Sequence, residues 1–291
     1  MDPIEQLLRA IIQQAGKVVL DFYGNSHITH TKQDEADVVT NADLASSNLI
    51  LSAIKEHFPD HGIISEEEED IQTNSEYVWI VDPIDGTRNY ATHTPLFGIS
   101  IAVARNNAVE YAAIYLPVTN ELFYAKRGCS ATVNGSPIKC SKKESLLKSY
   151  GAGFASWHKE RIGLIRKFAD AAENYEFWVS GIGSTVVSAV YVAGGRRDWM
   201  ISSDCNVWDY AAAVLLLIKM GGTITSLDGR PLPFKGDGII HKHGWLATTS
   251  KVSHAAILDS IRQRGRSNSR RPLHFYAILF TVYLEINLWH R

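Results

Sequence analysis

Apolar side chains recur at intervals of three and four residues over residues 4–22, a pattern typical of an amphipathic helix. Residues 2–5 add an acidic cap, a proline at the first helical position and a glutamate that completes a capping box. A second helix is predicted from Asp43 to Phe58, with Thr40 or Asn41 as its cap. The chain is therefore expected to start with two helices.

The apolar run at residues 77–81 predicts a strand that is buried on both faces and ends at Asp82-Pro83. An antiparallel meander is expected next, because turn-forming residues separate its strands and Asn134-Gly135 adds a hairpin signal. The meander strands are predicted at residues 97–104, 108–116 and 121–126. Further on, strands at 148–154, 176–180 and 197–202 are predicted to alternate with helices at 156–172, 183–193 and 206–220.

This change of pattern predicts two domains of the α/β class and a tail. We expect residues 1–145 to form an N-terminal α+β domain that carries most of the candidate metal ligands. Residues 146–265 are expected to form a C-terminal α/β domain that contributes Asp209. Its helix at 206–220 is expected to end at Gly221-Gly222, a C′ position. Residues 266–291 continue neither pattern and are interpreted as an atypical tail.

Composition narrows the class of protein. The 291 residues carry 29 Lys and Arg against 31 Asp and Glu, and 45% are hydrophobic, which excludes a disordered chain. The absence of a basic excess argues against a nucleic acid polymer or a membrane as partner. No apolar run reaches the roughly 18 residues of a membrane span, and the start lacks a signal-peptide pattern. Three cysteines without a CxxC pair fit a reduced, cytoplasmic protein.

The segment Asp82-Pro83-Ile84-Asp85-Gly86-Thr87 directly follows the predicted buried strand. Its proline and glycine allow a sharp turn that can point two carboxylates into one cleft. Such an arrangement suits Mg²⁺, which binds through a few carboxylates and retains water and phosphate oxygens. The backbone N–H groups of Gly86 and Thr87 could complement a phosphate. The alternative is a structural turn capped by the two aspartates.

Other acidic residues are candidates for the same site. Glu66 and Glu67 follow the apolar residues 62–64, at the end of a predicted strand, where their side chains can reach a cleft shared with Asp82. Asp209 lies near the start of an otherwise apolar helix. It is either a metal ligand or a charge matched to the helix dipole, and its spacing does not separate the two.

Six segments, taken in order, form a recognisable set. They are Asp37–Asp43, Ile64–Glu67, Trp79–Tyr90, Gly183–Thr185, Trp208–Ala212 and Gly221–Gly222. Together they resemble the inositol monophosphatase family of Mg²⁺-dependent, lithium-sensitive phosphatases, over about residues 4 to 262. The resemblance implies a layered αβαβα sandwich of the inositol monophosphatase and fructose-1,6-bisphosphatase type. It also implies a homodimer and about two or three Mg²⁺ ions, with Mn²⁺ as a substitute.

The resemblance further implies roles for individual residues. It implies that the metal ions are bound by Glu66, Asp82, Asp85, Asp209 and the backbone carbonyl of Ile84, with Glu67 near a further, weaker metal. The implied reaction is hydrolysis of a small phosphate monoester by a metal-activated water. The implied catalytic residues are Asp43, Glu66 and Thr87. Substrate contacts fall to Gly86, Thr87, Gly183, Ser184, Thr185 and Asp209, with the amides of the first two holding the phosphate.

One position departs from the family pattern. Ser202 stands where many members carry an acid that contacts substrate hydroxyls, seven residues before the Asp209 position, and Asp204 is close by. The identity of the small phosphorylated metabolite is therefore open. An inositol monophosphate-like ester is the first candidate. Fructose 1,6-bisphosphate, histidinol phosphate, NADP and 3′-phosphoadenosine phosphates are the alternatives within the same fold.

The residues themselves argue against two other classes of phosphate-binding protein. A haloacid-dehalogenase-type phosphatase has one residue between its two aspartates, whereas two separate Asp82 from Asp85. A dinucleotide site at Gly181-Ile182-Gly183 lacks its third glycine, because Val186 occupies that position. The alternative of another class is a non-catalytic protein that keeps the fold and binds a metal or a ligand.

Overall fold

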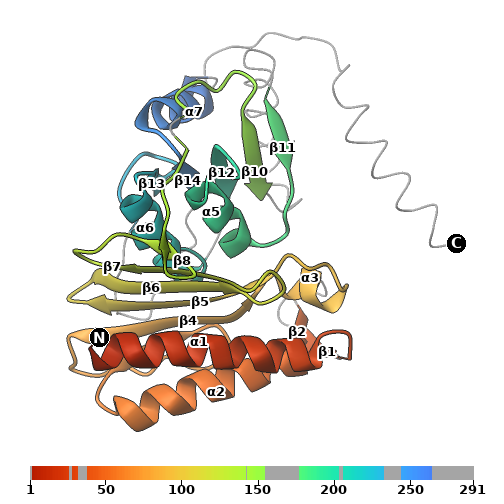
Figure 1. Cartoon of the computed structure of the whole chain (residues 1–291), viewed down its shortest axis with the longest axis vertical. Helices are drawn as coiled ribbons and strands as arrows, with labels where there is room; N and C mark the ends of the chain where they lie inside the picture. Colours follow the sequence, from red (N-terminus) through yellow and green to blue (C-terminus); the bar gives the residue numbers. More distant parts are fainter. Residues whose placement is uncertain are drawn as a thin grey trace, which may run out of the picture.

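The computed structural model describes residues 2–25, 28–31, 38–141, 143–154, 177–202, 206–232 and 244–263. These residues form five layers in the order helices, sheet, helices, sheet, helix (Figure 1). The layers confirm the predicted αβαβα sandwich. The predicted helix at 156–172, Asp204, Cys205 and the tail at 266–291 lie outside the described residues.

The first layer consists of α1 (Pro3–Phe22) and α2 (Asn41–His57). Both helices match the predicted ones and have predicted N-caps, Asp2 for α1 and Thr40 for α2. Their apolar faces pack on one side of the larger sheet, with Leu8, Ile12 and Ile50 fully buried. A short antiparallel pair leads into α2, formed by β1 (Ile28–Thr31) and β2 (Val38–Thr40).

The second layer is a seven-stranded sheet with the order β3-β4-β5-β6-β7-β8-β9. Its strands are β3 (Gly62–Ser65), β4 (Tyr77–Asp85), β5 (Gly98–Arg105), β6 (Ala108–Leu116), β7 (Glu121–Lys126), β8 (Thr132–Val133) and β9 (Ser136–Pro137). β3 is parallel to β4, and every later pair is antiparallel. The predicted meander and the hairpin at Asn134-Gly135 are therefore confirmed.

Both faces of this sheet are buried along β4 to β7, which explains why these strands are mostly apolar. In β4, Trp79 and Val81 pack toward α1 and α2, whereas Ile80 packs toward the third layer. In β5, Ile101 and Ala102 alternate in the same way. A small residue such as Ala102 on the second face lets the helices of the third layer approach the sheet closely.

The third layer consists of α5 (Thr185–Ala193) and α6 (Val207–Met220), and the fifth of α7 (Lys251–Gln263). The fourth layer is a sheet with the order β11-β10-β12-β14-β13. Its strands are β10 (Tyr150–Phe154), β11 (Trp178–Ser180), β12 (Trp199–Ser202), β13 (Thr223–Ser226) and β14 (Trp245–Thr248). α6 ends at Gly221 in a left-handed conformation, φ 90°, as predicted. None of the helices in the described part of the chain has the length and apolarity to cross a membrane.

His254 on α7 is buried against the second sheet. Its ring nitrogens lie 2.8 Å from the Thr225 hydroxyl and 3.1 Å from the Thr248 hydroxyl. Burial lowers the pKa of His254 from its ordinary 6.5 to about 4. The unfolded chain therefore takes up this proton at a higher pH than the folded chain. We expect this residue alone to reduce stability by about 2 kcal/mol between about pH 7 and about pH 5.

Urea unfolding of the wild type and of His254→Gln at those two pH values measures the effect. Glutamine keeps a polar group near Thr225 and Thr248 but does not titrate. The variant is therefore expected to lose about 2 kcal/mol less stability than the wild type on acidification. Equal losses in the two proteins would show that His254 does not contribute to the acid sensitivity of the fold.

Candidate metal and catalytic site

A bulge in β4 brings Asp82 and Asp85 to the same side of the strand. The strand does not stop at Asp82-Pro83, as the sequence suggests, but continues to Asp85. Asp82 pairs with Ser100 and Asp85 with Gly98, so three steps along β4 match two along β5. In a regular strand this odd spacing would place the two carboxylates on opposite faces. Pro83 is accommodated because a bulge requires no ladder hydrogen bond from it.

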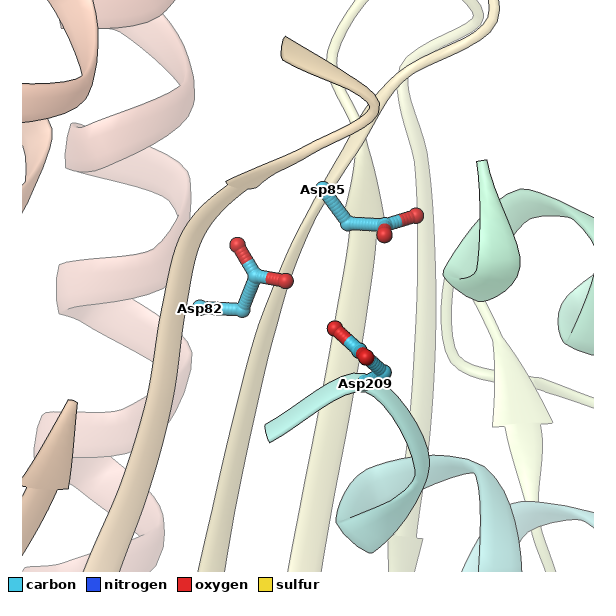
Figure 2. A group of neighbouring side chains, drawn as sticks. All are labelled: Asp82, Asp85 and Asp209. Carbon is cyan, nitrogen blue, oxygen red and sulfur yellow. The ribbon is translucent and has the colours of Figure 1, made fainter. Parts of the chain in front are cut away.

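Asp209 joins the two strand residues from the first turn of α6. One of its carboxylate oxygens accepts the N–H of Asn206 at 2.6 Å. Asp82, Asp85 and Asp209 each offer one carboxylate oxygen, and these oxygens all lie within 4.8 Å of one another. Figure 2 shows the three side chains close together, two from β4 and one from α6. Acids far apart in the sequence therefore converge where the larger sheet meets the third layer.

Asp82 is the most deeply buried of these acids. The residue is 1% exposed, and neither of its carboxylate oxygens has a hydrogen-bond partner among the described residues. Burial raises the pKa of Asp82 well above its ordinary value, and the negative charge of Glu66 raises it further. A buried carboxylate without a donor is costly unless a cation compensates it. The donor set, which is made of carboxylate oxygens, fits a divalent cation such as Mg²⁺.

Glu66 and Glu67 follow β3 and lie next to the buried acids. The Glu66 N–H donates to the Val81 carbonyl at 3.3 Å, which extends the pairing of β3 with β4 by one residue. The charge of Glu66 acts on Asp82, and the charge of Glu67 acts on Asp43. The structure therefore brings both glutamates to the same group of acids.

Asp43 and Thr87 form a hydrogen-bonded pair beside this group. Asp43 is 1% exposed, lies in the first turn of α2 and accepts the Thr40 N–H at 2.9 Å. The Thr87 hydroxyl lies 3.1 Å from Asp43 Oδ1 and 3.0 Å from the Ile84 carbonyl oxygen. Burial raises the pKa of Asp43 to about 6 against the opposing effect of the Thr40 hydrogen bonds. The Asp43 carboxylate is therefore placed to accept a hydrogen bond from the Thr87 hydroxyl.

The segment Gly183–Thr185 lies against Asp85. One Asp85 oxygen accepts hydrogen bonds from the Ser184 hydroxyl and from the Val186 N–H, the latter at 2.8 Å. The Thr185 N–H also donates to this carboxylate. Burial raises the pKa of Asp85 to about 6, and these hydrogen bonds oppose the rise. The segment was expected only to line the substrate side, but in the structure it also fixes a candidate metal ligand.

Two glycines permit this close approach. Gly86 has a left-handed φ of 87°, and a Cβ there would lie 2.9 Å from the Ser184 Cβ. Gly183 has a φ of 76°, and a Cβ there would lie 2.6 Å from Asn89 Oδ1. A side chain at either position would therefore both strain the backbone and separate the two loops.

Two residues beside the site were not among the predicted ones. The Ser46 hydroxyl donates to the Pro83 carbonyl at 3.0 Å and so ties α2 to the bulge. Asn89 donates to two backbone carbonyls. Its place within the Asp82–Tyr90 motif is a sequence signal by which it could have been predicted as a site residue. Ser46 offered no such signal. Ser202, the departure from the family pattern, ends β12 and is fully buried.

The layered sheets and the converging carboxylates define a class of protein, an α/β sandwich with a candidate metal site between a sheet and two helices. The family model described as the inositol monophosphatase family matches residues 1–266, and the chain belongs to this family. The resemblance inferred from the motifs is thereby confirmed.

Similar proteins support the same assignment. A fructose-1,6-bisphosphatase/inositol-1-monophosphatase of Thermotoga maritima is 30% identical over 220 residues, which cover 76% of this chain and 83% of that protein. Nus factor SuhB of Salmonella typhimurium is 32% identical over 236 residues, which cover 79% and 87%. The solved structure of an inositol monophosphatase from Anabaena (Nostoc) sp. has a TM-score of 0.74 at 30% identity, and the match covers 89% of this chain and 94% of that chain.

Proposed function

We propose that this protein is a Mg²⁺-dependent phosphatase that hydrolyses a small phosphate monoester. The observation that carries the proposal is the Asp82 carboxylate, which is buried without a hydrogen-bond donor and faces Asp85 and Asp209. A phosphate monoester dianion repels a nucleophile, so a site for its hydrolysis must neutralise charge. A group of buried carboxylates can neutralise the charge of a phosphate only if it binds cations.

The residues proposed to hold the metal are Glu66, Asp82, Asp85, Asp209 and the Ile84 carbonyl, with Glu67 at a further position. When bound, Mg²⁺ neutralises phosphate charge and lowers the pKa of water. Among the ligands, Asp85 and Asp209 each commit one oxygen to backbone N–H groups, at 2.8 Å from Val186 and 2.6 Å from Asn206. These hydrogen bonds fix the rotation of both carboxylates, so each presents its other oxygen in a defined direction.

Thr87 and Asp43 are proposed to orient the attacking water. The Thr87 hydroxyl has one proton and two acceptors within reach, Asp43 Oδ1 at 3.1 Å and the Ile84 carbonyl at 3.0 Å. If the Ile84 carbonyl binds a metal, the Thr87 hydroxyl donates its hydrogen bond to Asp43 instead. A lone pair of the threonine oxygen is then free to accept a hydrogen bond from water. Glu66, which lies close enough to Asp82 to raise its pKa, is proposed to assist.

The substrate is proposed to be a small phosphorylated metabolite bound against Gly86, Thr87 and the Gly183–Thr185 segment by a homodimeric protein. The name of the Thermotoga maritima relative includes both fructose 1,6-bisphosphate and inositol 1-phosphate as ester classes. Ser202 is neutral and fully buried, so it does not supply the acidic contact that many family members have at this position. An inositol phosphate-like ester and fructose 1,6-bisphosphate are therefore both tested first.

Release of inorganic phosphate by the purified protein tests the proposal. We expect turnover of at least one ester among inositol 1-phosphate, fructose 1,6-bisphosphate, histidinol phosphate, NADP and 3′-phosphoadenosine 5′-phosphate. Turnover should require Mg²⁺, stop in EDTA and fall when Li⁺ is added. The relative named Nus factor SuhB is not named for a reaction. A protein that binds Mn²⁺ but releases phosphate from none of these esters would favour the non-catalytic alternative.

A further inference from the structure

The Asn89 side chain joins two loops that lie far apart in the sequence. Asn89 is on the short helix α3 (Thr87–Ala91), directly after the Asp85-Gly86-Thr87 turn. Its Nδ2 donates to the Leu96 carbonyl and to the Ile182 carbonyl, both at 2.7 Å. Both partners can only accept, so the orientation of the amide is fixed by them. The second bond spans 93 residues and ties α3 to the turn that precedes α5.

The turn held by Asn89 leads directly into the residues that fix Asp85. Ile182 is followed by Gly183, which packs so closely on the Asn89 amide that a Cβ would lie 2.6 Å from Oδ1. Next come Ser184, whose hydroxyl donates to Asp85, and the first turn of α5 with its donating N–H groups. The position of the Asp85 carboxylate therefore depends on where this turn is held.

The hydrogen bonds of residues 184–186 tie the same turn to Asp85, and the Asn89 bond adds a direct link to α3. Gly86 and Gly183 have no side chains, and their close approach only permits the loops to meet. The hydroxyl of Ser184 and the N–H of Val186 hold the Asp85 carboxylate but do not hold the turn to α3. Two short hydrogen bonds from one planar amide to the backbone of both loops do so, because neither loop can then move without breaking a bond.

We propose that Asn89 is a positioning residue for the metal site, which acts by holding the first turn of α5 where it orients Asp85. The proposal rests on the proposed function only in that Asp85 ligates a divalent cation. It assigns Asn89 no contact with substrate or metal. Its loss should therefore weaken metal binding and loosen the start of α5, rather than remove a step of the reaction.

The test uses the full chain and Mn²⁺ alone as the probe, with affinity measured by calorimetry. Asn89→Ala is expected to weaken Mn²⁺ binding about tenfold, the usual effect of removing a group that orients a ligand. Hydrogen exchange at the amides of Thr185 and Val186 is expected to become several-fold faster. Both readouts are independent of catalysis, so they decide the proposal even if no phosphate ester is hydrolysed.

Asn134→Ala is the matched control. Asn134 also makes two hydrogen bonds with backbone groups, accepting from the Leu122 N–H at 2.8 Å and donating to the Asn120 carbonyl at 2.9 Å. These bonds tie the β8–β9 turn to Asn120 and to the start of β7, outside the acid cluster. The control is expected to lower the melting temperature while leaving Mn²⁺ affinity and exchange at residues 185 and 186 at wild-type values.

The outcomes are distinct. If Asn89→Ala lowers only the melting temperature, as the control does, the residue is merely structural and the proposal is overturned. If Asn89→Ala does not fold, Asn89→Ser is measured in its place, because serine keeps a polar group in the space of the amide, and the same comparison decides. Failure of the proposed function looks different, since the wild type would then release no phosphate although the two variants still differed in Mn²⁺ affinity.

Discussion

Replacing Asp85 with asparagine is expected to reduce turnover by about a thousandfold or more while the protein stays folded. One oxygen of Asp85 accepts hydrogen bonds from the Ser184 hydroxyl and the Val186 N–H, and an amide oxygen can accept both. The side chain therefore keeps its place in the fold through these hydrogen bonds. Asparagine lacks the second carboxylate oxygen and the negative charge that Asp85 brings to the three aspartates. It no longer acts as a ligand, because an N–H group does not bind a cation.

The same substitution is expected to raise the melting temperature of the metal-free protein. The folded pKa of Asp85, about 6, lies above its ordinary value of 3.8. The stability associated with this group is therefore present at low pH and is lost as the pH rises toward and through about 6. Asparagine removes this loss at neutral pH. Mg²⁺, which stabilises the wild type by binding the folded state, should stabilise the variant much less.

Thermal denaturation with and without Mg²⁺, together with phosphate release, measures both effects. Asp198→Asn is the control, because the Asp198 carboxylate accepts the Tyr150 N–H at 2.9 Å and lies at the opposite end of β12 from Ser202. This variant should keep both its turnover and its stabilisation by Mg²⁺. If Asp85→Asn retained more than about a tenth of wild-type turnover with the same Mg²⁺ requirement, Asp85 would not be an essential ligand.

The layers of the fold could be predicted because the long elements show their periods clearly. α1 spans more than five helical turns, and β6 was predicted with its observed bounds, Ala108–Leu116. The strands that the sequence did not predict, β1, β2, β13 and β14, have only three or four residues each. So few positions give a weak alternating pattern, and no strong apolar run marks these four strands in the sequence.

Where the site lies could be predicted, but how it is built could not. Asp82 and Asp85 follow a long apolar run, and their position at the end of a strand is a local property of the sequence. The bulge that turns both carboxylates to one side depends on pairing with β5, where Ser100 and Gly98 set the register. The hydrogen bond from Ser184 to Asp85 joins residues 99 positions apart. Contacts of this kind arise from packing between layers, which local periodicity does not encode.

Replacing Thr87 with alanine is expected to lower kcat by about a hundredfold or more while Mn²⁺ affinity stays within about threefold of the wild type. The Thr87 hydroxyl lies between Asp43 and the Ile84 carbonyl and is not one of the proposed metal ligands. Its removal leaves the carboxylates in place, so the cations should still bind. The water to be activated loses its hydrogen-bond acceptor and the fixed orientation that this acceptor provides.

Thr87→Ser and Thr92→Ala separate this role from a structural one. Serine keeps a hydroxyl that can donate to Asp43, so it should restore most of the lost turnover. Thr92 lies at the end of the same helix, where its exposed hydroxyl donates to the Arg88 carbonyl at 2.9 Å, so its loss should leave kcat unchanged. Equal losses of kcat and Mn²⁺ affinity in Thr87→Ala would instead show that Thr87 supports metal binding. A wild-type kcat in that variant would mean that Asp43 orients the water without an intervening hydroxyl.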